Sequence, residues 1–450
     1  MRYLIIILFL CNVFPIHAQG HFEFIKDEDK AVIPFQFVRN LALVPIKING
    51  VDLIFLVDTG VKETILFSLE DNTLSFKNTK RLKFNGLGEN EGIEAIQATG
   101  NTVEVGGELI DTAHTVYVIL NSDFNFSAYV GVPINGILGS HFFKDHPVEV
   151  DFVKHKLTVY RDSEQIERKV RKYERLDIEL ENSRPYIDTW LSLQQEGIKA
   201  KMLVDMGNSD AIMVFPSRVP DFRLNEPNIE EFIGRGFSGD IHGRMSRIHQ
   251  FQMGKFNFRT PTSSFPDSIA VRSAKLVKDR VGSVGNELLM RFNIIFDYTS
   301  QAIYIRKNKF YNKPFLVDMS GLDVKHDGMI WVQDWVKVNI PSEVTNDQLT
   351  STKPVYEAST GALQYKFVLK PSYSIVSVRK GSPAEHAGLK KGDMLISINR
   401  RMTGMMSLDQ IQHSLSEDEG KKINMVIRRN DQDVKVSFRL KDPIPYVEPS

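Results

Sequence analysis

Two aspartates occupy equivalent places in two similar stretches of the sequence and could do chemistry together. Asp58 lies in FLVDTG, residues 55–60, and Asp205 lies in MLVDMG, residues 202–207, 147 positions later. Each aspartate follows an apolar run and is followed two positions later by a glycine. Two carboxylates that share a site cannot both ionise readily, so they hold one proton between them. Such a pair can take a proton from water and give one to a substrate, which metal-free hydrolysis of a peptide bond requires.

The similarity around the two aspartates extends over a whole repeat. Both copies contain short runs of β-branched and aromatic residues, broken by Gly, Asn and Asp at positions typical of turns. The matching segments follow one another in the same order, which predicts two β-rich lobes at residues 30–165 and 170–310. The matched pairs beyond the aspartates are FNGLG at 84–88 with FIGRG at 232–236, Gly139 with Gly285, and VEVDFVKHKLTVYR at 148–161 with IIFDYTSQAIYIRK at 294–307.

This arrangement resembles the retropepsin-like and pepsin-like aspartic proteases over roughly residues 30 to 310. The resemblance is carried by Leu56 to Gly60, the glycine-rich stretch that follows, Ile137 to Gly139, and their counterparts in the second copy. It implies a mainly β, two-lobed acid-protease-like β-barrel domain. It also implies catalysis by Asp58 and Asp205 on a water molecule, a polypeptide substrate, no cofactor and no metal ion.

The residues beside the aspartates support the site in this family. The glycines Gly60 and Gly207 leave room for backbone to approach the carboxylates, and the resemblance implies that the hydroxyl of Thr59 ties the two lobes together. Met206 has no hydroxyl and departs from the family pattern. Two hypotheses therefore stay open: an aspartic endopeptidase, or a catalytically weak or silent peptide-binding protein. Exchange of Met206 for threonine would distinguish them.

Two glycine-containing segments are candidates for mobile flaps. The segments 84–100 and 232–247 contain Gly-x-Gly, but neither continues as the amphipathic helix that a dinucleotide site requires. The resemblance implies flaps that close over an extended peptide, and a plain exposed hairpin is the alternative for each. Asp151 and Asp297 also follow apolar strands, where the family has a structural aspartate before a tight turn. The glycines of the predicted flaps are Gly86, Gly88, Gly234 and Gly236.

The C-terminal part resembles a PDZ domain, an α+β fold, over residues 318–441, with a connector or insertion up to about residue 360. Ser382 and Pro383 predict the start of a short helix, and Gly388 predicts its left-handed end. A second helix is expected at Leu408 to Leu415 with Ser407 as its cap, followed by a strand pair around the turn Asn430-Asp431. The resemblance is carried by Gly381 to Ala384, Ala387 to Leu389, Gly392-Asp393 and Ile396 to Asn399.

PDZ domains bind extended peptides by adding a strand to a sheet edge. The segment Lys370 to Tyr373 is expected to replace the loop that receives a terminal carboxylate, but Pro371 lacks an N–H donor there. A domain that only packs on the lobes remains an alternative, and so does an envelope scaffold that works without residues 20–310. The residues predicted to bind peptide are Ser372, Tyr373, Ser374 and Ile375.

Composition and the N-terminus indicate class and location. The 450 residues are 42% hydrophobic and contain 56 basic and 56 acidic residues, which gives no reason to expect nucleic-acid binding. Residues 1–18 predict a signal peptide, and no later run reaches the ~20 apolar residues of a membrane span. Cys11 is the only cysteine, and Leu10 disfavours a lipoprotein signal there. We therefore expect a secreted or periplasmic protein without disulfides.

Overall fold

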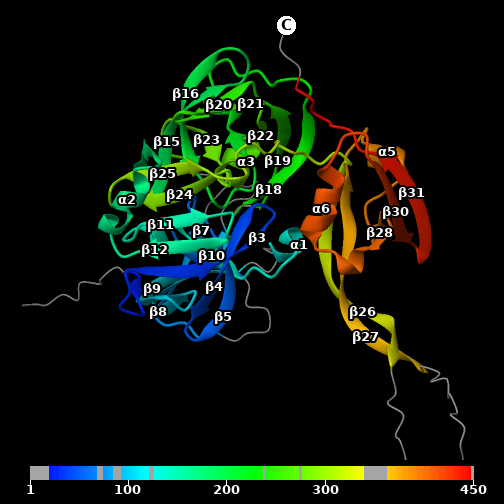
Figure 1. Ribbon diagram of the computed structural model, residues 1–450, viewed down its shortest axis with the longest axis horizontal. Helices are drawn as coiled ribbons and strands as arrows, with labels where there is room; N and C mark the ends of the chain where they lie inside the picture. Colours follow the sequence, from blue (N-terminus) through cyan, green and yellow to red (C-terminus); the bar gives the residue numbers. More distant parts are fainter. Residues whose placement is uncertain are drawn as a thin grey trace, which may run out of the picture. The chain divides into compact units, whose positions relative to one another are not determined.

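The computed structural model describes residues 20–67, 74–84, 93–120, 126–236, 239–272, 276–338 and 362–446, which form two compact units. The first unit comprises the described residues up to 120, Ile134–Phe315 and Tyr446, and the second comprises Phe126–Pro133 and Leu316–Pro445 (Figure 1). Strands dominate both units, which confirms the mainly β prediction. The predicted signal peptide lies outside the described residues. Within them, no helix is both long and apolar enough to cross a bilayer.

Lobe 1 is built on a nine-stranded sheet with the order β1-β9-β6-β10-β5-β4-β8-β7, and β3 pairs with β4. The turn between β4 and β5 has φ of 47° at Asn49 and 89° at Gly50, the left-handed pair that a tight two-residue hairpin needs. The strands are β1 (Glu23–Phe24), β3 (Gln36–Val38), β4 (Leu41–Ile48), β5 (Val51–Val57), β6 (Thr64–Leu66), β7 (Thr79–Phe84), β8 (Ile93–Val105), β9 (Leu109–Ile119) and β10 (Gly136–Leu138).

Lobe 2 is built on a ten-stranded sheet with the order β18-β19-β22-β17-β23-β16-β15-β20-β21, and β14 pairs with β15. The strands are β14 (Glu179–Glu181), β15 (Arg184–Ser192), β16 (Gly197–Val204), β17 (Ile212–Val214), β18 (Ile229–Gly236), β19 (Gly239–Arg247), β20 (Gln250–Met253), β21 (Phe256–Arg259), β22 (Thr262–Pro266) and β23 (Arg280–Val284).

The two lobes share one strand arrangement. In lobe 1, β10 pairs parallel with β5 and antiparallel with β6. In lobe 2, β23 pairs in the same way with β16 and β17. The repeat seen in the sequence is therefore a repeat of topology, and the predicted two-lobed architecture is confirmed.

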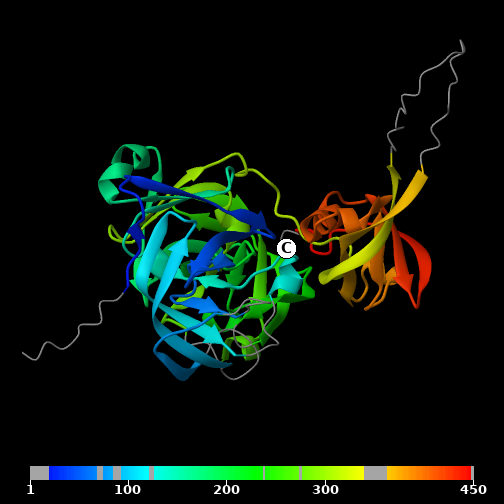
Figure 2. The same cartoon turned by 90° about the horizontal axis from the view of Figure 1, so that it is seen from below.

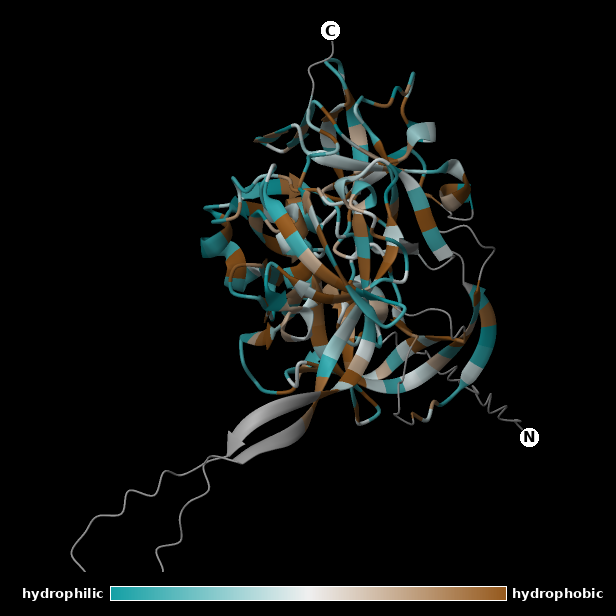
Figure 3. Cartoon of the chain, turned by 90° about the vertical axis from the view of Figure 1, so that its right-hand side faces the viewer, coloured by the Kyte–Doolittle hydropathy of each residue, from teal (hydrophilic) through white to brown (hydrophobic). Residues whose placement is uncertain are grey.

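A third sheet joins the lobes. Its order is β13-β25-β24-β11-β12-β2, and β11 pairs antiparallel with β24. In β2, buried and exposed residues alternate strictly, as expected for a strand with one face on the core. Several strands alternate between hydrophilic and hydrophobic residues along their length (Figure 3). Residues of both lobes form one hydrophobic core. The strands are β2 (Lys30–Pro34), β11 (Val148–Asp151), β12 (Lys156–Tyr160), β13 (Glu174–Asp177), β24 (Phe292–Asp297) and β25 (Ala302–Lys307).

Helices of the first unit are short and lie at the ends of strands. They are the 3-10 helices η1 (Ser140–Phe143), η2 (Ser163–Ile166) and η3 (Pro216–Arg218), and the α-helices α2 (Glu167–Val170), α3 (Ser268–Arg272) and α4 (Asn286–Leu289).

The second unit is α+β, as predicted. Ser382 caps α5 and Gly388 has φ of 80°, while Ser407 caps α6 in a reciprocal pair of bonds with Gln410. The sheet order is β26-β27-β28-β30-β31, with β29 beside β28, and the hairpin of β26 and β27 extends well beyond the other strands (Figure 2). The elements are α1 (Ser127–Val130), β26 (Leu322–Val338), β27 (Ala362–Val378), α5 (Pro383–His386), β28 (Met394–Ile398), β29 (Arg401–Met402), η4 (Thr403–Met405), α6 (Leu408–Ser416), β30 (Lys422–Arg429) and β31 (Gln432–Arg439).

Candidate active site

Asp58 and Asp205 follow directly after the equivalent strands β5 and β16. The backbone N–H of Asp58 donates to the carbonyl of Leu138 in β10 at 3.0 Å, and that of Asp205 donates to the carbonyl of Val284 in β23 at 2.9 Å. The parallel neighbours β10 and β23 thus hold both loops in place. The structure brings the two aspartates together, although 146 residues separate them in the chain.

The carboxyl groups of Asp58 and Asp205 lie close enough for each to shift the pKa of the other. Oδ1 of Asp58 accepts a hydrogen bond from the N–H of Gly60 at 2.7 Å, and Oδ1 of Asp205 accepts one from the N–H of Gly207 at 3.1 Å. Because two carboxylates this close cannot both ionise readily, the pair holds one proton between them.

Gly60 and Gly207 each face the carboxylate of the opposite lobe. A Cβ at Gly60 would lie 2.6 Å from Oδ1 of Asp205, and a Cβ at Gly207 would lie 2.2 Å from Oδ2 of Asp58. Both distances are far shorter than a normal contact between carbon and oxygen. Glycine is therefore required at both positions by the close approach of the opposite carboxylate.

The hydroxyl of Thr59 crosses from lobe 1 to lobe 2. It donates to the carbonyl of Val204 at 2.7 Å and accepts from the N–H of Met206 at 3.0 Å. Thr59 is fully buried, so water cannot replace either bond. The structure thus shows the cross-lobe connection that the resemblance implies for this residue.

Met206 is held without a hydroxyl of its own. Its side chain is fully buried in the hydrophobic core, and its carbonyl accepts from Nδ2 of Asn286 at 2.6 Å. Sequence reasoning did not select Asn286, although its place directly after the repeated Gly285 was a signal that could have found it. The second catalytic loop is thus held by the Thr59 hydroxyl, by the Asn286 amide and by apolar packing.

We expect Thr59→Val to lower the free energy of unfolding by roughly 2–6 kcal/mol. Valine has nearly the same shape, but it leaves the carbonyl of Val204 and the N–H of Met206 buried without a partner, at about 1–3 kcal/mol each. Urea unfolding measures the change, and Thr59→Ser, which keeps the hydroxyl, is the matched control. Equal stability of Thr59→Val and the wild type would show that this hydroxyl does not connect the lobes energetically.

Burial raises the pKa of both carboxyl groups. The pKa of Asp58 rises to about 8, first because of burial and second because of the negative charge of Asp205. Burial also raises the pKa of Asp205, but the positive charge of Arg280, the N–H of Gly207 and the hydrogen bond from Asp58 oppose that rise. The pair therefore holds one proton, and the charge of Arg280 favours ionisation of Asp205.

Arg280, whose charge acts on Asp205, is a second residue that sequence reasoning missed. It begins β23 and is only 4% exposed. Its Nε donates to the carbonyl of Gly282 at 3.1 Å, and its guanidinium lies 5.1 Å from the centroid of the Phe215 ring. No local pattern marks this arginine, because its place near Asp205 results from the pairing of β23 with β16.

The two predicted flaps differ in what the structure describes. β18 and β19 form an antiparallel hairpin, with Gly234 at an irregularity in the register and Gly236 at its end. In lobe 1, β7 and β8 also pair antiparallel, but Gly86 and Gly88 lie outside the described residues.

Asp151 and Asp297 each end a strand and accept hydrogen bonds from the backbone of the turn that follows. Oδ1 of Asp151 accepts from the N–H groups of Val153 and Lys154, both at 3.0 Å, and Oδ1 of Asp297 accepts from the N–H of Ser300 at 3.1 Å. Both carboxylates thus stabilise the turns that follow β11 and β24.

Comparison with protein families matches two parts of the chain. Residues 44–142 match the model described as an aspartyl protease, and residues 374–429 match the model described as a PDZ domain. The chain contains a retropepsin-like aspartyl protease domain and a PDZ domain.

Individual relatives resemble parts of this protein. Over 132 residues the chain is 27% identical to the "Retrovirus-related Pol polyprotein from transposon 412" of Drosophila melanogaster, a match that covers 29% of the chain. The chain spans only 10% of that polyprotein. A solved structure of the aspartic proteinase from Irpex lacteus is 11% identical, with a TM-score of 0.41, and the similarity covers 64% of this chain and 99% of that one.

In the PDZ domain, the segment expected to receive a terminal carboxylate is not a loop. Ser372, Tyr373, Ser374 and Ile375 lie inside β27, and Tyr373 and Ile375 are almost completely buried. The expectation of a loop at Lys370 to Tyr373 is therefore wrong. The reason is that β26 pairs with this stretch of β27 and makes it continuous strand.

The segment before β26 is better placed to be the end of a peptide groove. β26 is the edge strand of the sheet as described, and the N–H of Met319 donates to the carbonyl of Leu415 in α6 at 3.1 Å. The carboxylate of Asp318 accepts from the N–H groups of Gly321 at 2.5 Å and Leu322 at 3.3 Å. An internal carboxylate thus already occupies these two backbone donors.

Proposed function

We propose that this protein is an aspartic endopeptidase in which Asp58 and Asp205 act together on water. The observation that carries the proposal is the meeting of the two carboxyl groups, each of which faces the glycine of the opposite loop, and the pKa of Asp58 rises to about 8. Peptide hydrolysis by two acids requires one proton shared between them, and this pair retains it from acidic to neutral pH. The family and its substrate class support the proposal, since the matched domain is an aspartyl protease.

The two acids have different parts in the reaction. Ionised Asp205 takes a proton from a water molecule, whose oxygen forms a bond to the peptide carbonyl carbon. Protonated Asp58 gives its proton to the carbonyl oxygen as that oxygen gains negative charge. Asp205 then gives the proton that it took from water to the amide nitrogen, while ionised Asp58 takes a proton back from a hydroxyl group of the tetrahedral intermediate. The carbon–nitrogen bond breaks, and a carboxyl and an amino end are released.

Cleavage of a diverse mixture of unstructured peptides from about pH 3 to 9 tests the function. We expect cleavage that declines as pH rises through about 8, where Asp58 loses its proton. The double variant Asp58→Asn/Asp205→Asn should cleave nothing. A folded wild-type protein that cleaves no peptide at any pH, or a double variant as active as the wild type, would reject the proposal.

Removal of the Arg280 charge should move the acid limb of the pH profile to higher pH. Arg280 holds the pKa of Asp205 below the value that burial alone would produce. In Arg280→Met, Asp205 would therefore become protonated at a higher pH, which gives the pair its second proton and stops the reaction. The measurement is kcat/KM against pH. Arg280→Lys keeps a positive charge and should move the limb less, whereas equal profiles for Arg280→Met and the wild type would contradict the role.

Met206 is the observation that favours the alternative, a catalytically weak or silent peptide-binding protein. Met206→Thr adds a hydroxyl where the family has one. A silent wild type whose Met206→Thr variant cleaves peptides would show that the hydroxyl alone is missing. The bonds from Thr59 and Asn286 to the backbone of Met206 support the endopeptidase instead, because they hold the loop without it.

We propose further that the PDZ domain binds a polypeptide as an added strand at the edge of β26, beside α6. Since Asp318 occupies the N–H groups of Gly321 and Leu322, an internal segment fits this edge better than a free C-terminus. The location proposed from residues 1–18 is secreted or periplasmic. N-terminal sequencing of the mature protein from cell fractions tests that proposal.

A further inference from the structure

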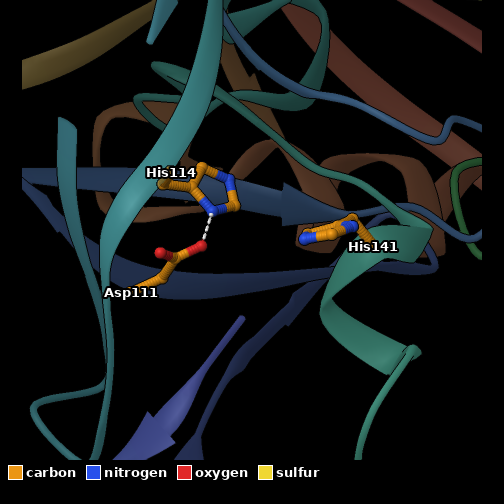
Figure 4. Close-up of side chains that lie close together, drawn as sticks. All are labelled: Asp111, His114 and His141. Carbon is orange, nitrogen blue, oxygen red and sulfur yellow. Dashed lines mark hydrogen bonds and ion pairs between the residues drawn. The ribbon is translucent and has the colours of Figure 1, made fainter. Parts of the chain in front are cut away.

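A second cluster of chemically active side chains lies in lobe 1, apart from the paired aspartates. Asp111 and His114 come from β9, and His141 comes from η1 (Figure 4). One donor atom from each residue lies within 4.8 Å of the other two. Asp111 and His114 are almost completely buried. The spacing of these residues in the sequence does not suggest a metal site, because the third donor lies on a separate element.

The backbone at Gly20 adds a fourth oxygen to this cluster. Nε2 of His141 lies 2.9 Å from the carbonyl oxygen of Gly20. A Cβ at Gly20 would lie 2.4 Å from Oδ2 of Asp111, so only glycine lets the chain pass this close to the carboxylate. The segment that leads into β1 therefore lies directly against the three side chains.

Neighbouring groups orient two of the three donors. Nδ1 of His114 lies 2.6 Å from Oδ2 of Asp111, and its Nε2 lies 2.7 Å from the hydroxyl oxygen of Thr64. Without a metal, Nδ1–H donates to Asp111 and Nε2 accepts from the hydroxyl of Thr64. With a metal, Nε2–H would donate to Thr64 instead, and the lone pair of Nδ1 would be free to bind the ion. The other carboxylate oxygen, Oδ1, accepts from the N–H of Ala113 at 2.9 Å. Bonds of this kind, which fix the tautomer and direction of each ligand, accompany metal-binding histidines and carboxylates.

The charge of the cluster also suits a cation. Among the described residues, the ion pair formed by Asp111 is with His114, and no lysine or arginine forms one with it. A buried carboxylate without a lysine or arginine partner is stabilised by a cation placed beside it.

We propose that Asp111, His114 and His141 bind a Zn²⁺ ion, with the carbonyl oxygen of Gly20 or a water molecule as the fourth ligand. Two imidazoles and a carboxylate are a donor set that zinc prefers. Ligands at about 2.0–2.2 Å from a tetrahedral zinc lie about 3.3 Å apart. Nδ1 of His114 and Oδ2 of Asp111, which now lie 2.6 Å apart, would therefore have to move apart by less than about 1 Å to bind the ion. The ion would attach the Gly20 segment to lobe 1 and has no part in the chemistry of Asp58 and Asp205.

Zinc binding to the full chain tests the proposal without any measurement of peptidase activity. The protein is treated with a chelator and desalted, and bound metal is measured by equilibrium dialysis against Zn²⁺ and by mass spectrometry of the metal. We expect one Zn²⁺ per chain and a higher melting temperature with zinc than without it. Co²⁺ in the same site should give the strong visible absorption of a tetrahedral complex.

Two variants separate this site from adventitious binding. His141→Gln removes a partly exposed ligand and should weaken zinc binding at least about tenfold, and Thr64→Val, which removes only the orienting hydroxyl, should weaken it by about 10- to 100-fold. His413→Gln changes a histidine in the PDZ domain whose side chain is 67% exposed, and should bind zinc like the wild type. Absence of bound zinc in the wild type, or unchanged affinity in His141→Gln, would overturn the proposal and identify a plain hydrogen-bond network.

Discussion

Asp58→Asn is expected to reduce peptide cleavage at least about 100-fold at every pH while making the folded protein more stable at pH 8. The loss of activity follows because asparagine cannot give a proton to the substrate carbonyl, and positioned proton transfer contributes about 10²–10⁴-fold. The gain in stability follows from burial, which raises the pKa of Asp58 from 3.8 to about 8. A structural residue would not show these two opposite effects.

The sign of the stability change follows from proton uptake. In the unfolded chain Asp58 loses its proton near pH 4, whereas in the folded protein it keeps the proton until about pH 8. The wild type therefore loses stability as pH rises between these values, by up to about 1.4 kcal/mol per pH unit, and the non-titrating asparagine does not. The advantage of Asp58→Asn should thus be small at pH 4 and largest near pH 8.

Urea unfolding at pH 4, 6 and 8, together with kcat/KM, measures both effects. Asp52→Asn is the matched control, because Asp52 lies on the same strand with its side chain 87% exposed. It should leave activity and the pH dependence of stability unchanged. Wild-type activity in Asp58→Asn would rule out the shared carboxyl pair. The raised pKa of Asp58 would be ruled out if the difference in stability between Asp58→Asn and the wild type did not change with pH.

Gly207→Ala should lower kcat at least about 100-fold, although glycine itself takes no part in proton transfer. The added Cβ would lie 2.2 Å from Oδ2 and 2.3 Å from Cγ of Asp58. The carboxyl group or the loop must then move by about 1 Å to restore normal contact. A displacement of that size at a reacting group costs about 100-fold in rate.

Peptide cleavage and thermal unfolding of the same preparations measure this effect. Gly60→Ala, whose Cβ would lie 2.6 Å from Oδ1 of Asp205, should show a similar loss. Ser209→Ala, two residues further along the same loop, should retain activity because its backbone carbonyl still accepts from Nδ2 of Asn40. A fully active Gly207→Ala enzyme would show that the carboxylates need not lie this close to the opposite loop.

Features that depend on neighbours in the chain could be predicted from the sequence. The strand ends before Asp58 and Asp205, the hairpin at Asn49-Gly50, the caps Ser382 and Ser407 and the turn at Asn430-Asp431 all depend on residue type and local spacing. The repeated order of the segments around the aspartates was enough to predict two β lobes, and the resemblance of the C-terminal part to PDZ domains predicted the separate α+β domain. The same order identified the two carboxylates that the fold brings together.

Features that depend on strand pairing over long distances were decided only by the tertiary structure. In the PDZ domain, Lys370 to Tyr373 were expected to form a loop but belong to β27, because β26 pairs with them. Which strands pair, and therefore which strand lies at the edge of the sheet, cannot be read from a local pattern. Pairing of β23 with β16 brings Arg280 near Asp205, and Asn286 at the start of α4 bonds to the carbonyl of Met206. Asp111 and His114 lie on β9, and His141 lies on η1, which follows β10. These residues meet because β9 and β10 lie on either side of β6 in the sheet. Each of these contacts joins elements whose spacing in the sequence has no fixed period, so local patterns cannot specify them.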